Sequence, residues 1–455
     1  MNRTILTINL VLVCFLFSAT CLASVHEKTL ANGLKVVVKE DRRAPVVTSQ
    51  VWYKVGSADE FGGITGVSHV LEHMMFKGTP KYPNGQFNEI LAKAGARDNA
   101  FTSRDYTGYY QLLDVSKLEI SFDLESDRMA HLDLDPKEFS KEINVVKEER
   151  RLRTEDNPNA LTYEQLNAAA FTTSPYRQPV IGWMNDLDSM KVGDLREWYE
   201  AWYSPSNATL VVVGDVDAGE VFALAEKYYG ANPKREVKTP KPRIEPRQDG
   251  ERRIEVKAAA KLPYILIGYK VPSLVTIEDE REAYALHILA GILDGGRSSR
   301  FSKNLVREQE IATSAGAGYH IYAERDSLFL FDGTPNSEHT AKQLEQAIAN
   351  EILKLQTELV SLEELDRVKA QVIASEVYQQ DSIQSQASTI GALESVGLGW
   401  QTMEVYADKV QEVTPEDVRN VAQKYLIDEA KTVAELIPME NKARASGLRG
   451  INPNS

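Results

Sequence analysis

Residues 66–79 read GVSHVLEHMMFKGT, an apolar-periodic run that carries two histidines. Its spacing predicts a helix over Thr65–Phe76, on which His69 and His73 lie one turn apart and roughly 40° apart around the axis. Glu72 lies beside them. Two imidazoles at this spacing can hold a zinc ion, and the adjacent carboxylate can reach a water molecule on the metal. The run is the inverted form of the H-E-x-x-H signature and predicts a Zn2+ site with Glu72 as general base.

A catalytic zinc ion needs a third protein ligand, and no third histidine lies nearby in the sequence. The candidates are Glu142, Glu148 and Glu149, on a segment expected to be helical. Glu142 and Glu149 are seven residues apart and share one helical face, whereas Glu148 points about 100° away. Spacing alone leaves the choice open. The alternative, two surface histidines on an amphipathic helix, is disfavoured because the chain has only seven histidines and two fall at this spacing.

A Pro-rich and charge-rich stretch, NPKREVKTPKPRIEPRQDGERR at 232–253, is expected to be an exposed linker between two halves of similar length. The halves repeat short patterns at offsets of 216 to 223 residues, among them Tyr53-Lys54 with Tyr269-Lys270 and Asp194-Leu195-Arg196 with Asp417-Val418-Arg419. Each half is interpreted as strands, a helix, strands, paired helices and a closing strand. This pattern predicts an α+β fold of two homologous halves, each a mainly antiparallel sheet with helices packed on one face.

The metal motif occurs in the first half only. At the same offsets the histidine positions fall on Ala285 or Leu286 and on Leu289 or Ala290, and Glu149 corresponds to Gln371. His287 is therefore expected to be a packed histidine. We predict a zinc-binding catalytic half at 24–231, a linker at 232–253 and a homologous non-metal half at 254–455.

The first 23 residues are predicted to be a signal peptide, because a basic start at Arg3 precedes an almost wholly apolar run to Ala23 that ends in small residues. An uncleaved membrane anchor is the alternative. No later stretch approaches the ~20 apolar residues that span a bilayer. Both cysteines, Cys14 and Cys21, fall within this segment, so the mature chain is expected to lack disulfides. Export without disulfides favours a periplasmic or secreted protein, with no membrane span after signal removal.

The net charge of −14, without basic tracts, makes the chain a poor candidate for binding nucleic acid, because phosphate contacts need clustered lysine and arginine. The composition is otherwise that of an ordinary globular protein.

The chain resembles the pitrilysin/insulinase peptidase family, most closely its bacterial branch related to mitochondrial processing peptidase. The resemblance rests on the run at 66–79 and on the paired-glutamate segment at 142–149, and it extends over nearly the whole mature chain. It implies that Glu149 is the third zinc ligand and that Glu142 supports the ligands from outside. It also implies a zinc endopeptidase in which Glu72 takes a proton from the attacking water and passes it to the leaving amine.

The resemblance further implies how a peptide substrate is bound. Asn99 and Ala100, in the run NAFTS at 99–103, resemble an edge strand that pairs with bound peptide. In this family the non-metal half supplies an arginine and, seven residues later, a tyrosine. Arg307 matches the arginine, but the run that follows it is one residue short, so that Thr313 stands where the tyrosine is expected. Tyr319 could replace it only if the loop folds back.

The incomplete arginine–tyrosine pair predicts a homologous partner subunit that supplies it in a heterodimer, with a homodimer as the other possibility. Two further hypotheses belong to other classes. One is a non-catalytic peptide-binding subunit of a peptidase-like complex, which would be expected to lose metal ligands, whereas this chain keeps a complete set. The other is a zinc hydrolase of small molecules, which the two-half architecture disfavours because that architecture suits the enclosure of a chain.

Overall fold

The computed structural model describes residues 24–83, 85–237, 241 and 243–439. The predicted signal peptide lies outside the described residues. Within the residues that are described, no helix is both long and apolar enough to cross a bilayer. The first half contains, in order, β1 (Val25–Thr29), β2 (Lys35–Glu40), β3 (Val46–Tyr53), α1 (Val67–Met74), α2 (Gln86–Lys93), β4 (Arg97–Thr102), β5 (Thr107–Asp114), η1 (Val115–Lys117), α3 (Leu118–His131), α4 (Pro136–Arg150), η2 (Arg151–Glu155), α5 (Pro158–Ala170), η3 (Pro175–Arg177), α6 (Met184–Ser189), α7 (Val192–Trp202), η4 (Pro205–Asn207), β6 (Ala208–Gly214) and α8 (Ala218–Tyr229).

The second half begins after the linker and repeats the same kinds of element. It contains β7 (Arg252–Ala259), β8 (Tyr264–Val271), α9 (Glu280–Asp294), η5 (Phe301–Glu308), β9 (Ala312–Gly318), β10 (Ser327–Pro335), α10 (Ala341–Thr357), α11 (Leu362–Gln379), α12 (Ile383–Ser395), α13 (Thr402–Glu412), α14 (Pro415–Tyr425), η6 (Asp428–Ala430) and β11 (Lys431–Met439).

The two sheets share one strand order. The first sheet runs β1-β2-β6-β3-β5-β4 and the second runs β7-β11-β8-β10-β9, so the second matches the first without a counterpart of β1. In each sheet the closing strand of the half pairs in parallel with the first shared strand, β6 with β2 and β11 with β7, and the other pairs are antiparallel. The predicted α+β fold of two homologous, mainly antiparallel halves is confirmed.

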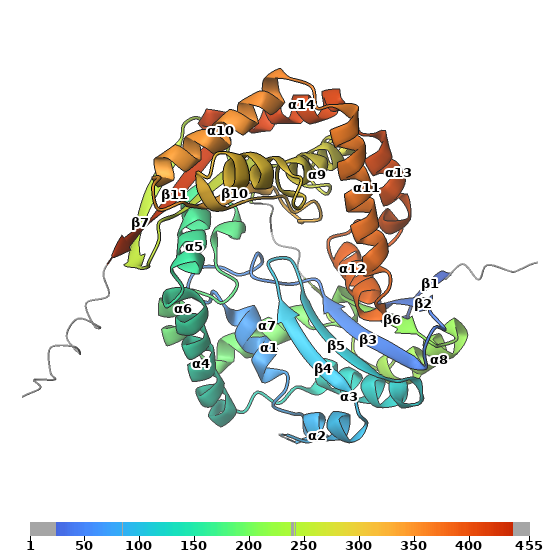
Figure 1. Cartoon of the computed structure of the whole chain (residues 1–455). Coiled ribbons are helices and arrows are strands. Elements are labelled where there is room, and N and C mark those ends of the chain that lie inside the picture. Colours follow the sequence, from blue (N-terminus) through green and yellow to red (C-terminus); the bar gives the residue numbers. More distant parts are fainter. Residues whose placement is uncertain (1–23, 84, 238–240, 242, 440–455) are drawn as a thin grey trace, which may run out of the picture.

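Each half packs its helices against one sheet face around its own hydrophobic core, one built from Val36, Val51, Leu71 and Leu210 among others and one from Ile267, Leu289 and Val433 among others. One helix of each half also packs on the sheet of the other half. Helix α12 contacts β6 and β3, and α5 contacts β7, β8 and β11 (Figure 1). Gly391 of α12 allows this approach, because a Cβ there would lie 2.1 Å from the Trp52 ring. The exchange ties the halves together.

Most described residues of the linker are exposed, but Glu245 is not. The carboxylate of Glu245 is 5% exposed, forms an ion pair with Lys270 Nζ at 2.6 Å, and accepts hydrogen bonds from the backbone N–H groups of Thr172, Thr173 and Ser174. Its charge therefore joins the first half to β8 of the second. Composition alone missed this contact because a Pro-rich, charged stretch is usually solvated.

Candidate metal centre

Helix α1 carries the histidine motif and is anchored in the first core by its apolar face. Val67, Val70, Leu71 and Met74 are fully buried there. The helix begins at Val67 instead of the predicted Thr65, because Gly66 adopts a left-handed conformation with φ +88°. His69 and His73 project together from the opposite side, with ring centroids 4.9 Å apart.

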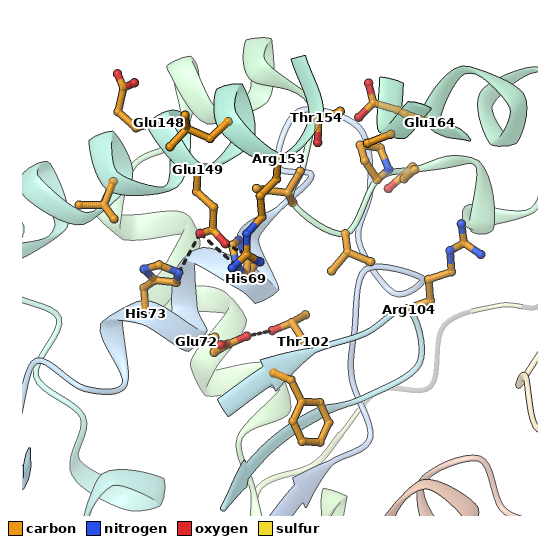
Figure 2. Close-up of a pocket in the computed structure, with 18 of the residues that line it drawn as sticks. His69, Glu72, His73, Thr102, Arg104, Glu148, Glu149, Arg153, Thr154 and Glu164 are labelled. Carbon is orange, nitrogen blue, oxygen red and sulfur yellow. Dashed lines mark hydrogen bonds and ion pairs between the residues drawn. The ribbon is translucent and has the colours of Figure 1, made fainter. Parts of the chain in front are cut away.

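The structure brings His69, His73 and Glu149 together. One ligand atom from each lies within 4.8 Å of the other two. Glu149 Oε2 lies 3.4 Å from His73 Nε2 and 3.8 Å from His69 Nε2 (Figure 2). The carboxylate reaches this position because α4 packs against α1.

The other glutamates of α4 have different surroundings. Glu148 points away from the histidines, is 66% exposed and pairs with Arg151 (Figure 2). Glu142 lies behind His73, with its Oε2 3.3 Å from His73 Nδ1 and its Oε1 2.6 Å from Lys77 Nζ. A proton on Nδ1 shared with Glu142 leaves Nε2 of His73 free to donate its lone pair.

Glu72 lines the same cavity as the histidines and Glu149 but is not one of the three grouped metal ligands. Its carboxylate accepts a hydrogen bond from Thr102 Oγ1 of β4 at 2.5 Å (Figure 2). Burial raises the pKa of Glu72, and the Thr102 hydrogen bond opposes that rise. Burial, with smaller contributions from His73 and Arg153, lowers the pKa of His69 to about 3. His69 is therefore neutral at physiological pH, the form that binds a metal.

The three groups fit a catalytic zinc ion. Two imidazole nitrogens and one carboxylate oxygen are donors that zinc prefers, and three protein ligands leave a coordination position for water or substrate. Because the donors converge on one point and His69 is held neutral by burial, the residues present match the predicted metal.

The histidines and Glu72 open onto a cavity of about 1190 Å³. Asn99 and Ala100 of β4, which are predicted to contact the substrate, line it together with the exposed apolar side chains of Val145, Leu152 and Tyr163. β4 forms one edge of the first sheet, so its outer side is free of a partner strand in the part of the chain that is described. Every residue that lines this cavity belongs to the first half.

The structure does not bring the second-half candidates to this cavity. Arg307 lies exposed on η5 and is not among the lining residues. Thr313, on β9, is exposed and donates to the backbone oxygen of Thr334 at 3.1 Å. Tyr319 donates its hydroxyl to the backbone oxygen of Pro272 at 2.8 Å and stacks on Phe329. The structure therefore gives no support to Tyr319 as a replacement for the family tyrosine.

Two residues of the site were missed from the sequence. Thr102 belongs to the run NAFTS and was not linked to Glu72. Arg153 pairs with Glu149 Oε1 at 2.8 Å, leaving Oε2 toward the histidines. Its position four residues after Glu149 on a helical segment was a signal for this contact.

The sequence is similar to those of known peptidases. Residues 35–183 match the family model "Insulinase (Peptidase family M16)", and residues 189–372 match "Peptidase M16 inactive domain". The chain is 32% identical over 418 residues to zinc protease PqqE of Helicobacter pylori, covering 91% of this chain and 93% of the relative. It is 26% identical over 413 residues to an uncharacterized zinc protease, YmxG, of Bacillus subtilis, covering 91% of this chain and 98% of the relative.

Solved structures show the same fold. A protease from Helicobacter pylori aligns with a TM-score of 0.86 and 31% identity, over 92% of this chain and all of that chain. The periplasmic protease PqqL from Escherichia coli aligns with a TM-score of 0.77 and 19% identity, over 94% of this chain but only 49% of that chain. The fold described here thus corresponds to about half of that longer protein.

Proposed function

The chain belongs to the insulinase (M16) peptidase family, and from this premise we propose that it is an exported zinc-dependent endopeptidase that cleaves peptides or unfolded segments. The proposal is carried by the convergence of His69, His73 and Glu149 within 4.8 Å of one another, beside a cavity that also contains Glu72. Relatives that are named zinc proteases support it.

His69, His73 and Glu149 would hold the metal. Zinc, when bound, polarises the scissile carbonyl and activates a water molecule. Glu72 would act as the general base, taking a proton from the attacking water on its carboxylate and delivering it to the leaving amine. The hydrogen bond from Thr102 orients this carboxylate.

The substrate would lie along β4. An extended peptide can add to a free sheet edge by main-chain hydrogen bonds, which tolerates many side chains. Asn99 and Ala100 offer that edge to the cavity, and Val145, Leu152 and Tyr163 offer apolar contact from α4, η2 and α5.

The proposed setting is the periplasm or the exterior, after removal of the signal peptide at 1–23. The apolar leader supports export, and one structural relative is named a periplasmic protease. The proposed assembly includes a homologous partner subunit. Support comes from the cavity, which is lined only by first-half residues among those described, and from the absence of Arg307 from its wall.

The direct test is a fluorogenic assay with an unfolded, internally quenched polypeptide. Cleavage should stop after treatment with a chelator and return when one equivalent of zinc is added. Cleavage that persists without metal would contradict the proposal, as would the release of single terminal residues only.

A further inference from the structure

The residue at the N-cap position of helix α1 has no side chain that could cap the helix. The first N–H groups of a helix lack partners within the helix and are usually satisfied by a side chain at the N-cap position. That position is Gly66, which has no side chain to accept a hydrogen bond. A Cβ at residue 66 would lie 2.7 Å from the backbone oxygen of Ile181, and φ is +88°, so a serine or aspartate does not fit there.

Glu60 supplies the missing cap from outside the helix. Its Oε2 accepts a hydrogen bond from Gly66 N at 2.7 Å, and its Oε1 accepts one from Ser68 N at 2.9 Å. The side chain is completely buried. Among the described residues no lysine, arginine or histidine forms an ion pair with it. Burial raises the pKa of Glu60 to about 8, and the hydrogen bonds from Gly66 N and Ser68 N oppose that rise.

A second carboxylate holds the segment between Glu60 and the helix. Asp186 accepts hydrogen bonds from the backbone N–H groups of Gly63 and Thr65 and from Thr65 Oγ1 at 2.5 Å. The backbone that enters α1 is thus bound at three N–H groups before the helix begins and at Ser68 inside its first turn.

The binding of the backbone at the start of α1 affects the metal centre because the rings of the two histidines are held by different contacts. His73 has Glu142 at its Nδ1, which fixes the ring from behind. The Nδ1 of His69 is buried and has no hydrogen-bond partner among the described residues. The direction of His69 is therefore set by the backbone that carries it, and Ser68, the residue before it, is bound by Glu60.

We propose that Glu60 is a positioning residue of the metal centre: its buried carboxylate caps α1 through Gly66 and Ser68 and so fixes His69 in the direction that the metal requires. The inference rests on the proposed zinc site. Glu60 touches neither metal nor substrate and acts through the helix. In Glu60→Gln one of the two acceptor oxygens is replaced by an amide that cannot accept, and in Glu60→Ala both are lost.

The test compares zinc affinity in the full chain by competition with a chromophoric chelator. Outer groups that orient metal ligands typically contribute 10- to 100-fold to affinity, so we expect a loss of roughly tenfold or more in Glu60→Ala and a smaller loss in Glu60→Gln. The visible spectrum of the Co2+-loaded protein should also change. Glu351→Gln is the matched control, because Glu351 is equally buried but lies on α10 of the second half.

Hydrogen exchange on the metal-free protein gives a readout that does not depend on zinc. The amides of Gly66 and Ser68 should exchange faster in Glu60→Gln and remain protected in Glu351→Gln. If Glu60→Ala does not fold, Glu60→Gln carries the comparison. Unchanged zinc affinity and cobalt spectrum in a folded Glu60 variant would overturn the inference while leaving the proposed function intact. A wild-type protein that binds no zinc would overturn both.

Discussion

Glu149 Oε2 lies 3.4 Å from His73 Nε2, although 76 residues separate the two in the chain. The contact exists because α4 packs against α1, and it is reinforced by Arg153, which holds the other oxygen of Glu149. Glu148, the next residue along, is turned to solvent. Of these two adjacent glutamates, Glu149 therefore faces the pair of histidines and Glu148 points away from it.

The first prediction follows from this contrast. Metal analysis of the purified protein should show about one equivalent of zinc per chain. Glu149→Gln should lose most of it, because a neutral amide replaces the carboxylate that faces both histidines. Glu148→Gln should keep it and serves as the control. Full zinc content in Glu149→Gln together with loss in Glu148→Gln would reverse the assignment.

The second prediction separates catalysis from binding. Glu72→Gln should retain zinc but lose most peptidase activity, on the order of 10²-fold or more, because the amide cannot take the proton from the attacking water. Zinc content and the rate of peptide cleavage are measured on the same preparation. Near-normal turnover in Glu72→Gln would remove this residue from the mechanism.

The repeated fold and the metal helix could be predicted from the sequence, because both depend on local spacing and on order along the chain. His69, His73 and Glu72 share one short helix. Spacing left three glutamates open as the third ligand, and only the family resemblance selected Glu149. The exchange of α5 and α12 between the halves could not be predicted, because it depends on which sheet each helix meets in space. The later start of α1 depends on the left-handed backbone of Gly66, which the helical spacing did not indicate.

A third prediction concerns Glu142, which contacts His73 from the side away from the metal. Glu142→Gln should weaken zinc binding about 10-fold, because the amide no longer accepts the Nδ1 proton as a charged partner and Lys77 loses its ion pair. Chelator competition measures the change. Glu138→Gln, on the same helix, is the control and should bind zinc like the wild type.

The fourth prediction concerns acid stability. Burial alone would raise the pKa of Glu245, but the ion pair with Lys270 and the N–H groups of Ser174, Thr172 and Thr173 outweigh it and lower the pKa to about 2 from its ordinary value of 4.5. A depressed pKa means that the stabilisation is present above pH 4.5 and is lost as the pH falls toward 2. Glu245→Gln should therefore be less stable than wild type at pH 7.

Thermal unfolding between pH 7 and pH 2 tests this directly. The difference in Tm between wild type and Glu245→Gln should shrink as the pH falls below 4.5. Glu255→Gln, which alters an exposed carboxylate on β7, should show no such convergence. A constant difference across the whole range would mean that the charge of Glu245 is not what stabilises the linker.

The last prediction concerns assembly. Arg307 is exposed and lies outside the cavity wall, Thr313 occupies the position expected for a tyrosine, and Tyr319 is bound to Pro272. The zinc half therefore faces a cavity without the second-half donors that stabilise a developing oxyanion, and losing one such donor typically costs about 10²–10³ in rate. The chain alone should bind zinc but cleave peptides weakly. A homologous partner that lacks the histidine motif and carries an arginine and a tyrosine in its second half should raise the rate sharply.

The measurement is a fluorogenic peptide assay titrated with that partner, with sedimentation to count subunits and Arg307→Ala as the matched variant. Because Arg307 does not reach the cavity, Arg307→Ala should leave the weak basal rate unchanged. Full activity from a monomer or homodimer, undiminished by Arg307→Ala, would show that the missing tyrosine does not matter.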